Sequence, residues 1–128
     1  MKRRSILQSP VVLLVEDEPL VRELEIDVLQ DAGFRVIEAR TADEAFDMLR
    51  GRPDVRIVFT DVDMPGSING FEFARLVHQG WPEVAILVSS GKMQPKEGDL
   101  PDGAAFIAKP YRPDALVEQL QKLVREEA

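Results

Sequence analysis

Short runs of aliphatic residues alternate along this chain with longer segments of mixed polarity. The runs are Val11–Val15, Arg35–Ala39, Arg56–Thr60, Val84–Ser89 and Ala105–Ala108. Three of them are almost unbroken aliphatic sequences, as expected for strands that are covered on both faces. The more mixed run Arg35–Ala39 suits the edge of a sheet. This alternation predicts a doubly wound α/β domain with a parallel sheet, right-handed crossovers and helices on both faces.

The first two segments between the runs carry helix start and stop signals. Pro19 is typical of a first helical position, and Gly33 closes the stretch that follows it. Thr41 and Glu44 form a capping box, in which each side chain binds a backbone amide that the helix leaves free. Gly51 ends that second helix. Both segments are therefore predicted to be helical.

Two more helices are expected, over Phe71–Gln79 and from Pro113 onward. Helical spacing predicts which side chains of all four helices face the core. These are Val21, Leu24, Val28 and Ala32 in the first helix, Ala42, Ala45, Phe46 and Leu49 in the second, Phe73, Leu76 and Val77 in the third, and Leu116, Val117, Leu120, Leu123 and Val124 in the last.

The stretch between Ser89 and Ala105 departs from the alternation of strands and helices. A crossover helix is expected there, but residues 90–103 contain prolines at two positions and glycines at three. Proline and glycine are the residues that cost a helix most, so at most about one helical turn fits. We therefore predict that the fourth helix is short or replaced by a mostly irregular loop. A three-turn helix over residues 92–100 would contradict this.

Composition narrows the class of protein. A chain of 128 residues is one domain by size, and its net charge of −7 argues against nucleic-acid binding by this chain alone. The absence of cysteine excludes disulfides, thiolate catalysis and cysteine-bound zinc. The apolar run Val11–Val15 is too short for a signal-peptide core, and no stretch could span a membrane. The cytoplasm is the expected location, with no membrane partner.

Four of the predicted strands end on polar residues that phosphoryl chemistry can use. Glu16 and Asp17 follow the first strand, Asp61 follows the third, Ser89 ends the fourth and Lys109 follows the fifth. Ligands of an open parallel sheet bind at the carboxyl ends of its strands, so we expect these side chains to share one pocket. Carboxylates, a hydroxyl and an ammonium together suit a cation and a transferring phosphoryl group.

Short motifs accompany these polar residues. They are Met64-Pro65 after the third strand, Gly70-Phe71-Glu72 at a helix start and Lys109-Pro110 after the fifth strand. In this order the pieces resemble the receiver domain of two-component response regulators, of the single-domain chemotaxis type, from about Val11 to Glu126. The resemblance implies a flavodoxin-like fold with strand order 2-1-3-4-5. It also implies a receiver domain at residues 11–128 after an N-terminal extension of residues 1–10.

The resemblance implies a role for each acidic residue of the pocket. Asp61 is the expected phosphoacceptor, whose carboxylate attacks a histidine-bound phosphoryl group or a small acyl phosphate. Mg²⁺ is the expected cofactor, because it takes oxygen ligands and retains bound water. Asp17, Asp61 and the backbone carbonyl of Asp63 would bind it directly, and Glu16 would act through water. Lys109 resembles the ammonium that neutralises phosphoryl oxygens.

Ser89, Phe106 and Tyr111 are expected to respond to phosphorylation of the acceptor. Ser89 would donate its hydroxyl to the phosphoryl group, with the neighbouring Ser90 as the alternative donor. Phe106 matches the aromatic residue that family members reorient on phosphorylation, although it could simply be core. Tyr111 is a candidate for the same signalling surface. The one histidine, His78, ends a helix and is expected to be a solvated residue without a relay function.

Three departures from the common family pattern carry expectations. Glu16 stands where aspartate is frequent, which alters the distance to a cation. Asp63 adds a negative charge near the acceptor, and we hypothesise that it alters dephosphorylation. Because the fourth helix commonly contributes to dimerisation and output, its loss predicts an output surface built from the last helix, Phe106 and Tyr111.

The expected function is a phosphoacceptor signalling domain, whose only reactions are its own phosphorylation and dephosphorylation. Its expected partners are a histidine kinase or histidine phosphotransfer protein and a downstream protein target. The start at Met1 and the end at Ala128 favour a stand-alone receiver. The alternatives are a phosphorelay shuttle or sink, or one domain of a hybrid histidine kinase or larger regulator.

Two other classes compete with this function. The strand ending in Asp61-Val62-Asp63 also resembles the Asp-x-Asp of haloacid-dehalogenase-type phosphatases, in which Asp61 would be the nucleophile and Asp63 the acid. In those enzymes the acidic pair follows the nucleophile, whereas Glu16 and Asp17 precede it here. A receiver-like module that binds a partner without phosphorylation is the third option.

Overall fold

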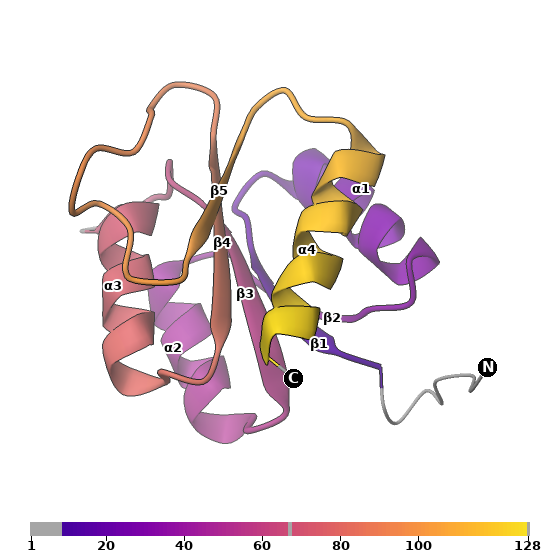
Figure 1. The fold of residues 1–128 in the computed structure, drawn as a ribbon, viewed down its shortest axis with the longest axis horizontal. Helices are drawn as coiled ribbons and strands as arrows, with labels where there is room; N and C mark the ends of the chain where they lie inside the picture. The colour runs from indigo at the N-terminus through magenta and orange to yellow at the C-terminus, as the bar shows by residue number, and fades with distance from the viewer. Residues whose placement is uncertain (1–8, 67, 128) are drawn as a thin grey trace.

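The computed structural model describes residues 9–66 and 68–127 (Figure 1). Residues 1–8 of the expected N-terminal extension lie outside the described residues. The strands are β1 (Val11–Val15), β2 (Arg35–Ala39), β3 (Val55–Asp61), β4 (Ala85–Ser90) and β5 (Ala105–Ala108). The helices are α1 (Pro19–Asp31), α2 (Ala42–Gly51), α3 (Gly70–Gly80) and α4 (Pro113–Glu127). The predicted strands and helices are thus all present, with β3, β4 and α3 beginning or ending one residue away from the predicted bounds.

The five strands form one parallel sheet in the order β2-β1-β3-β4-β5. This confirms the predicted doubly wound fold and its flavodoxin-like strand order. Helices α2 and α3 cover one face of the sheet, and α1 and α4 cover the other (Figure 1). The chain runs from β1 outward to β2 and then crosses back to β3 on the other side of β1. The connections after β1 and β3 therefore leave in opposite directions, which opens a crevice at the carboxyl ends of these two strands, where ligands of such sheets bind.

The central strands β1, β3 and β4 are buried because each contributes side chains to both cores. Val11, Leu13 and Val15 of β1 pack in the cluster on the α2–α3 side, whereas Val12 and Leu14 pack on the α1–α4 side. This follows from the alternation of side chains along a strand. It also explains why the central strands read as continuous aliphatic runs.

Most of the helix residues predicted to face the core do so, but Leu24 of α1 and Leu76 of α3 are 67% and 39% exposed. The buried stripe of α1 passes through Glu25 and Leu29, four residues apart, and one position along a helix turns a side chain by about 100°. A glutamate is thus buried where a leucine was expected. In α3 the predicted core residues Phe73 and Val77 are buried, together with Gly70, Phe71 and Ala74.

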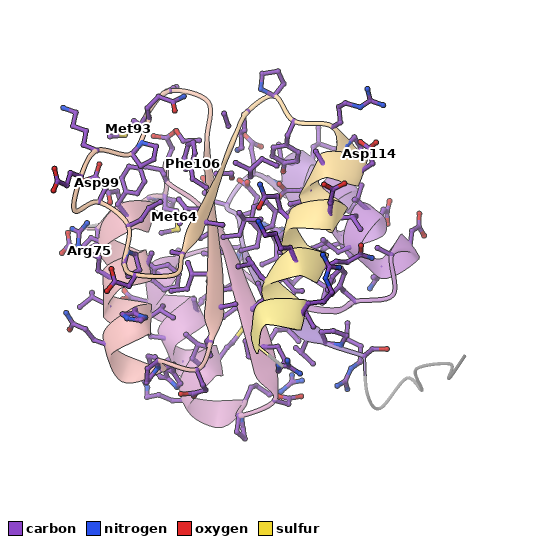
Figure 2. The ribbon with its side chains drawn as sticks, viewed as in Figure 1. Met64, Arg75, Met93, Asp99, Phe106 and Asp114 are labelled. Carbon is purple, nitrogen blue, oxygen red and sulfur yellow. The ribbon has the colours of Figure 1, made fainter. Side chains whose placement is uncertain are left out.

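Residues 91–104 contain no helix, which confirms the predicted loop (Figure 1). The hydroxyl of Ser90 accepts hydrogen bonds from the backbone amides of Lys92 and Met93, at 3.1 and 3.0 Å, and so fixes the start of the loop. Arg75 of α3 donates to the carbonyl of Asp99 at 2.9 Å, and the two residues lie beside each other at the outer bend (Figure 2). The loop is therefore tied to β4 at one end and to α3 at its middle.

Candidate functional site

The acidic residues of the site lie where β1 and β3 end. Asp61 is the last residue of β3 and is paired in register with Ser89 of β4. Glu16 follows β1 directly, and its backbone amide donates to the carbonyl of Ala39 at 3.0 Å, which continues the pairing with β2. The regular sheet therefore fixes the backbone of all three residues at one edge.

Lys109 is brought to this edge by the end of β5. Its backbone amide donates to the carbonyl of Ser90 at 3.0 Å. Its ammonium Nζ lies 3.2 Å from Oδ2 of Asp61 and 4.0 Å from Oε1 of Glu16. The ammonium thus pairs with Asp61 and lies at the outer limit of pairing with Glu16.

The Asp61 carboxylate is only partly satisfied. Its side chain is 11% exposed, and Oδ2 is paired with Lys109. The other oxygen, Oδ1, is buried and has no hydrogen-bond partner among the described residues. A buried oxygen without a partner is costly and is rare in folded proteins, so such an atom calls for an explanation. A ligand that binds at Oδ1 would provide one.

The Glu16 carboxyl group is more deeply buried, and burial raises its pKa above the usual range. A hydrogen bond from the backbone amide of Glu18 to Oε2, at 3.1 Å, and the charge of Lys109 lower the pKa. The charges of Asp61 and Asp17 raise it further. Two acids around one ammonium leave excess negative charge at the site, which favours a cation.

The donor chemistry at this edge fits Mg²⁺, which prefers carboxylate and carbonyl oxygens. The unpartnered Oδ1 of Asp61 is an oxygen of this kind. Asp17 and Asp63 lie in the adjoining loops and are exposed. Within the described residues, no three histidine or acidic side chains come together as a metal-binding group. The carboxylates are therefore neighbours in the fold rather than a closed coordination shell.

The two serines at the end of β4 have different surroundings. Ser90 already accepts the two amide hydrogen bonds at the start of the loop. Ser89 is equally buried, and it is the residue that pairs with Asp61 across the sheet. This geometry favours Ser89 over Ser90 as a hydroxyl that faces Asp61.

The two aromatic candidates lie on opposite faces of the sheet. Phe106 packs against the α2–α3 cluster, which also includes Met64 at its margin (Figure 2). Tyr111 packs against the α1–α4 cluster, where its ring lies 6.4 Å from that of Phe59. Both rings are half-buried, and the output surface expected from the last helix, Phe106 and Tyr111 stays a prediction.

The sequence analysis did not single out Glu25, and it gave Gly70 no role beyond marking a helix start. Glu25 is buried in α1 and accepts a hydrogen bond from the Tyr111 hydroxyl. Gly70 begins α3 directly against the end of β3, where a Cβ would lie 2.3 Å from the carbonyl oxygen of Asp61. The signal for Gly70 was its place at the helix start. The signal for Glu25 was an acid flanked by apolar residues in α1.

Comparisons with known proteins give the family. The family model for the response regulator receiver domain matches residues 12–121. The hydrogenase transcriptional regulatory protein HoxA of Cupriavidus necator is 33% identical over 123 residues, which cover 91% of this chain and 24% of HoxA. The chain spans about a quarter to a half of the length of HoxA and similar regulators.

Solved structures give the same fold. A response regulator receiver protein from Sinorhizobium medicae superposes with a TM-score of 0.86 at 24% identity, covering 95% of this chain and 99% of that one. The response regulator TrrA of Thermotoga maritima, in complex with Mg²⁺ and BeF, gives 0.78 at 25% identity, covering 89% and 98%.

The fold and the site define a phosphoacceptor-type α/β signalling domain. The chain belongs to the response regulator receiver domain family. It is therefore not a haloacid-dehalogenase-type phosphatase, in agreement with the order of its acidic motifs. None of the helices in the described part of the chain combines the length and apolarity needed to cross a bilayer.

Proposed function

We propose that this domain accepts a phosphoryl group on Asp61 from a histidine kinase or a histidine phosphotransfer protein. The observation that carries the proposal is the state of the Asp61 carboxylate. Lys109 pairs with Oδ2, while Oδ1 is buried without a partner among the described residues. An acid held in this way has a fixed orientation and one oxygen free to react.

The reaction is a displacement at phosphorus. A carboxylate oxygen of Asp61 forms a bond to phosphorus, and the bond from phosphorus to the donor's histidine nitrogen breaks. The donor imidazole leaves with the electron pair, and the product is an acyl phosphate on Asp61. The ammonium of Lys109 neutralises phosphoryl oxygens, and the Ser89 hydroxyl donates a hydrogen bond to the new group.

We also propose that the reaction at Asp61 requires bound Mg²⁺. Asp17, Asp61 and the backbone carbonyl of Asp63 would hold it, with Glu16 acting through water. Bound Mg²⁺ supplies positive charge that lets an anionic donor approach an anionic acid. Support comes from the excess of carboxylates around Lys109 and from TrrA, which was solved with Mg²⁺ and BeF.

Receiver domains act between histidine kinases and downstream effectors, and we extend this order to the present chain. Phosphorylation of Asp61 would change the binding of a downstream protein, with Phe106 and Tyr111 as the side chains that respond. The proposal places this exchange in the cytoplasm and gives the domain no activity beyond its own phosphorylation and dephosphorylation.

The test is phosphoryl uptake from acetyl phosphate in the presence of Mg²⁺, followed by intact-protein mass spectrometry. The wild-type chain is expected to gain one phosphoryl group per molecule, and Asp61→Asn is expected to gain none while keeping its fold. Asp43→Asn is the matched control, because it removes an exposed acid of α2 outside the site and should leave the uptake unchanged. Uptake by Asp61→Asn at the wild-type level would overturn the proposal.

A further inference from the structure

Glu25 is a buried acid outside the phosphoryl pocket. It lies on α1, is 6% exposed, and faces the apolar cluster between α1 and α4. The Tyr111 hydroxyl donates a hydrogen bond to its Oε2, whereas Oε1 is buried and has no partner among the described residues. Burying a carboxyl group costs free energy unless hydrogen bonds or a charged partner offset the loss of water, and here only one of its two oxygens has a partner among the described residues.

The partner of Glu25 stands close to the site along the chain. Tyr111 follows Lys109 by two residues, and its ring lies 6.4 Å from that of Phe59, which precedes Asp61 by two residues in β3. Glu25, Lys109 and Tyr111 also line one cleft of about 590 Å³ between α1 and α4. A change in the contact between the Tyr111 hydroxyl and Glu25 is therefore close to the segments that carry Lys109 and Asp61.

The charge of Glu25 can change near neutral pH. Burial raises the pKa of this carboxyl group to about 7, against a lowering by the hydrogen bond from Tyr111. The charges that face it from the neighbouring elements are Glu16 after β1 and Asp61 of β3, which raise its pKa, and Lys109 after β5, which lowers it. Burial and Glu25 raise the pKa of Tyr111, so its hydroxyl stays protonated and remains the donor.

We propose that Glu25 is a positioning residue for Lys109: by holding the Tyr111 hydroxyl it fixes residues 109–111 against α1, and the charge of Glu25 sets how firmly Lys109 is presented to Asp61. This inference rests on the proposed phosphoryl uptake at Asp61. A hydrogen bond to an ionised carboxylate is roughly twice as strong as one to a neutral group. Proton uptake by Glu25 therefore loosens Tyr111 and the segment that carries Lys109.

The first test is the pH dependence of the initial rate of phosphoryl uptake from acetyl phosphate. The wild-type rate is expected to fall several-fold from about pH 8 to about pH 6, with a step centred where Glu25 titrates. Glu25→Gln and Tyr111→Phe should both lose this step. Glu23→Gln, an exposed acid on the same helix, should keep it. A wild-type pH profile in Glu25→Gln overturns the inference.

A second readout does not need phosphorylation. In the unphosphorylated protein, NMR can follow the Glu25 carboxyl carbon and the side-chain signals of Lys109 over the same pH range. The Lys109 signals are expected to shift with the midpoint of Glu25, and this shift should vanish in Tyr111→Phe. If the protein takes up no label at any pH, the proposed function fails. If it takes up label but Lys109 does not follow Glu25, the positioning role alone is wrong.

A paired variant separates this role from general stability. Glu25→Leu combined with Tyr111→Phe removes both polar partners and keeps the cleft filled, a replacement that is often close to neutral for folding. This double variant is expected to stay folded and to take up label at a rate without the step near neutral pH. Retention of the wild-type step by the folded double variant contradicts the inference.

Discussion

The ammonium Nζ of Lys109 lies 3.2 Å from Oδ2 of Asp61, while the other oxygen of the same carboxylate is buried without a partner among the described residues. Lys109 thus pairs with only one of the two carboxylate oxygens of Asp61. Lys109 offsets the cost of burying the acid, and the Asp61 side chain, 11% exposed, relies on it for charge compensation. The same contact that stabilises the fold therefore orients the acid that we propose reacts.

Replacing Lys109 by methionine should expose this dependence. The variant leaves the Asp61 carboxylate buried beside Glu16 with no cation, so the free energy of unfolding at neutral pH should fall by about 1–3 kcal/mol. Phosphoryl uptake should also slow. Urea denaturation of Lys109→Met, Asp61→Asn and the double variant measures the coupling. Additive losses from the two single changes would contradict a direct interaction.

Gly70 at the start of α3 is predicted to be essential for the shape of the site. A Cβ at this position would lie 2.3 Å from the Asp61 carbonyl oxygen and 2.6 Å from Cα of Val62. Gly70→Ala must therefore displace the end of β3, at a cost of about 1–3 kcal/mol, and slow uptake at Asp61. Gly80→Ala, at the other end of the same helix, is the control because its Cβ would meet nothing within 4 Å. Equal uptake by the two variants would contradict this.

The arrangement of the main pocket could be predicted from the sequence because it depends on backbone topology. Once alternating strands and helices imply a parallel sheet, the residues that follow the strands must meet at one edge. Asp61, Lys109 and Glu16 meet there. The loop at residues 91–104 was predictable for a similar reason, since proline and glycine act locally on the backbone.

Side-chain partners across the core could not be predicted in the same way. Glu25 was assigned no core position because an acid is normally exposed, and its partner Tyr111 lies 86 positions away in the chain. Leu24 was assigned to the core because a leucine normally is buried, yet it is exposed. In both cases tertiary contacts override the pattern of polarity, and only the packing of α1 against α4 decides between the two neighbouring positions.

Asp63 offers a test of what controls the lifetime of the proposed phosphoryl group. Its exposed side chain lies two residues beyond Asp61 and adds negative charge close to the site. Asp63→Ala is expected to change the half-life of the aspartyl phosphate, by removing repulsion of, or a contact to, the attacking water. The half-life after removal of acetyl phosphate measures this effect. An unchanged half-life would remove Asp63 from the account of dephosphorylation.

The burial of Glu25 predicts an unusual dependence of stability on pH. Its pKa is about 7 in the folded protein and 4.5 as the ordinary value, so between these pH values the folded state holds more protons than the unfolded chain. Stability must then fall as pH rises through this window and be greatest at its acidic end. The shift corresponds to a loss of at most about 3 kcal/mol in the free energy of unfolding. Burial of Glu16 acts in the same direction.

Glu25→Gln isolates the contribution of this residue. Glutamine has nearly the same shape and stays neutral, so the variant should match the wild type near pH 4, below the ordinary pKa of 4.5, and exceed its stability near pH 8. Urea denaturation across this range gives the difference directly, with Glu23→Gln as the exposed control on α1. A stability difference between Glu25→Gln and the wild type that does not change with pH would mean that Glu25 is ionised in the folded protein throughout. The buried carboxyl group would then be compensated by Tyr111 and Lys109 alone, without a proton.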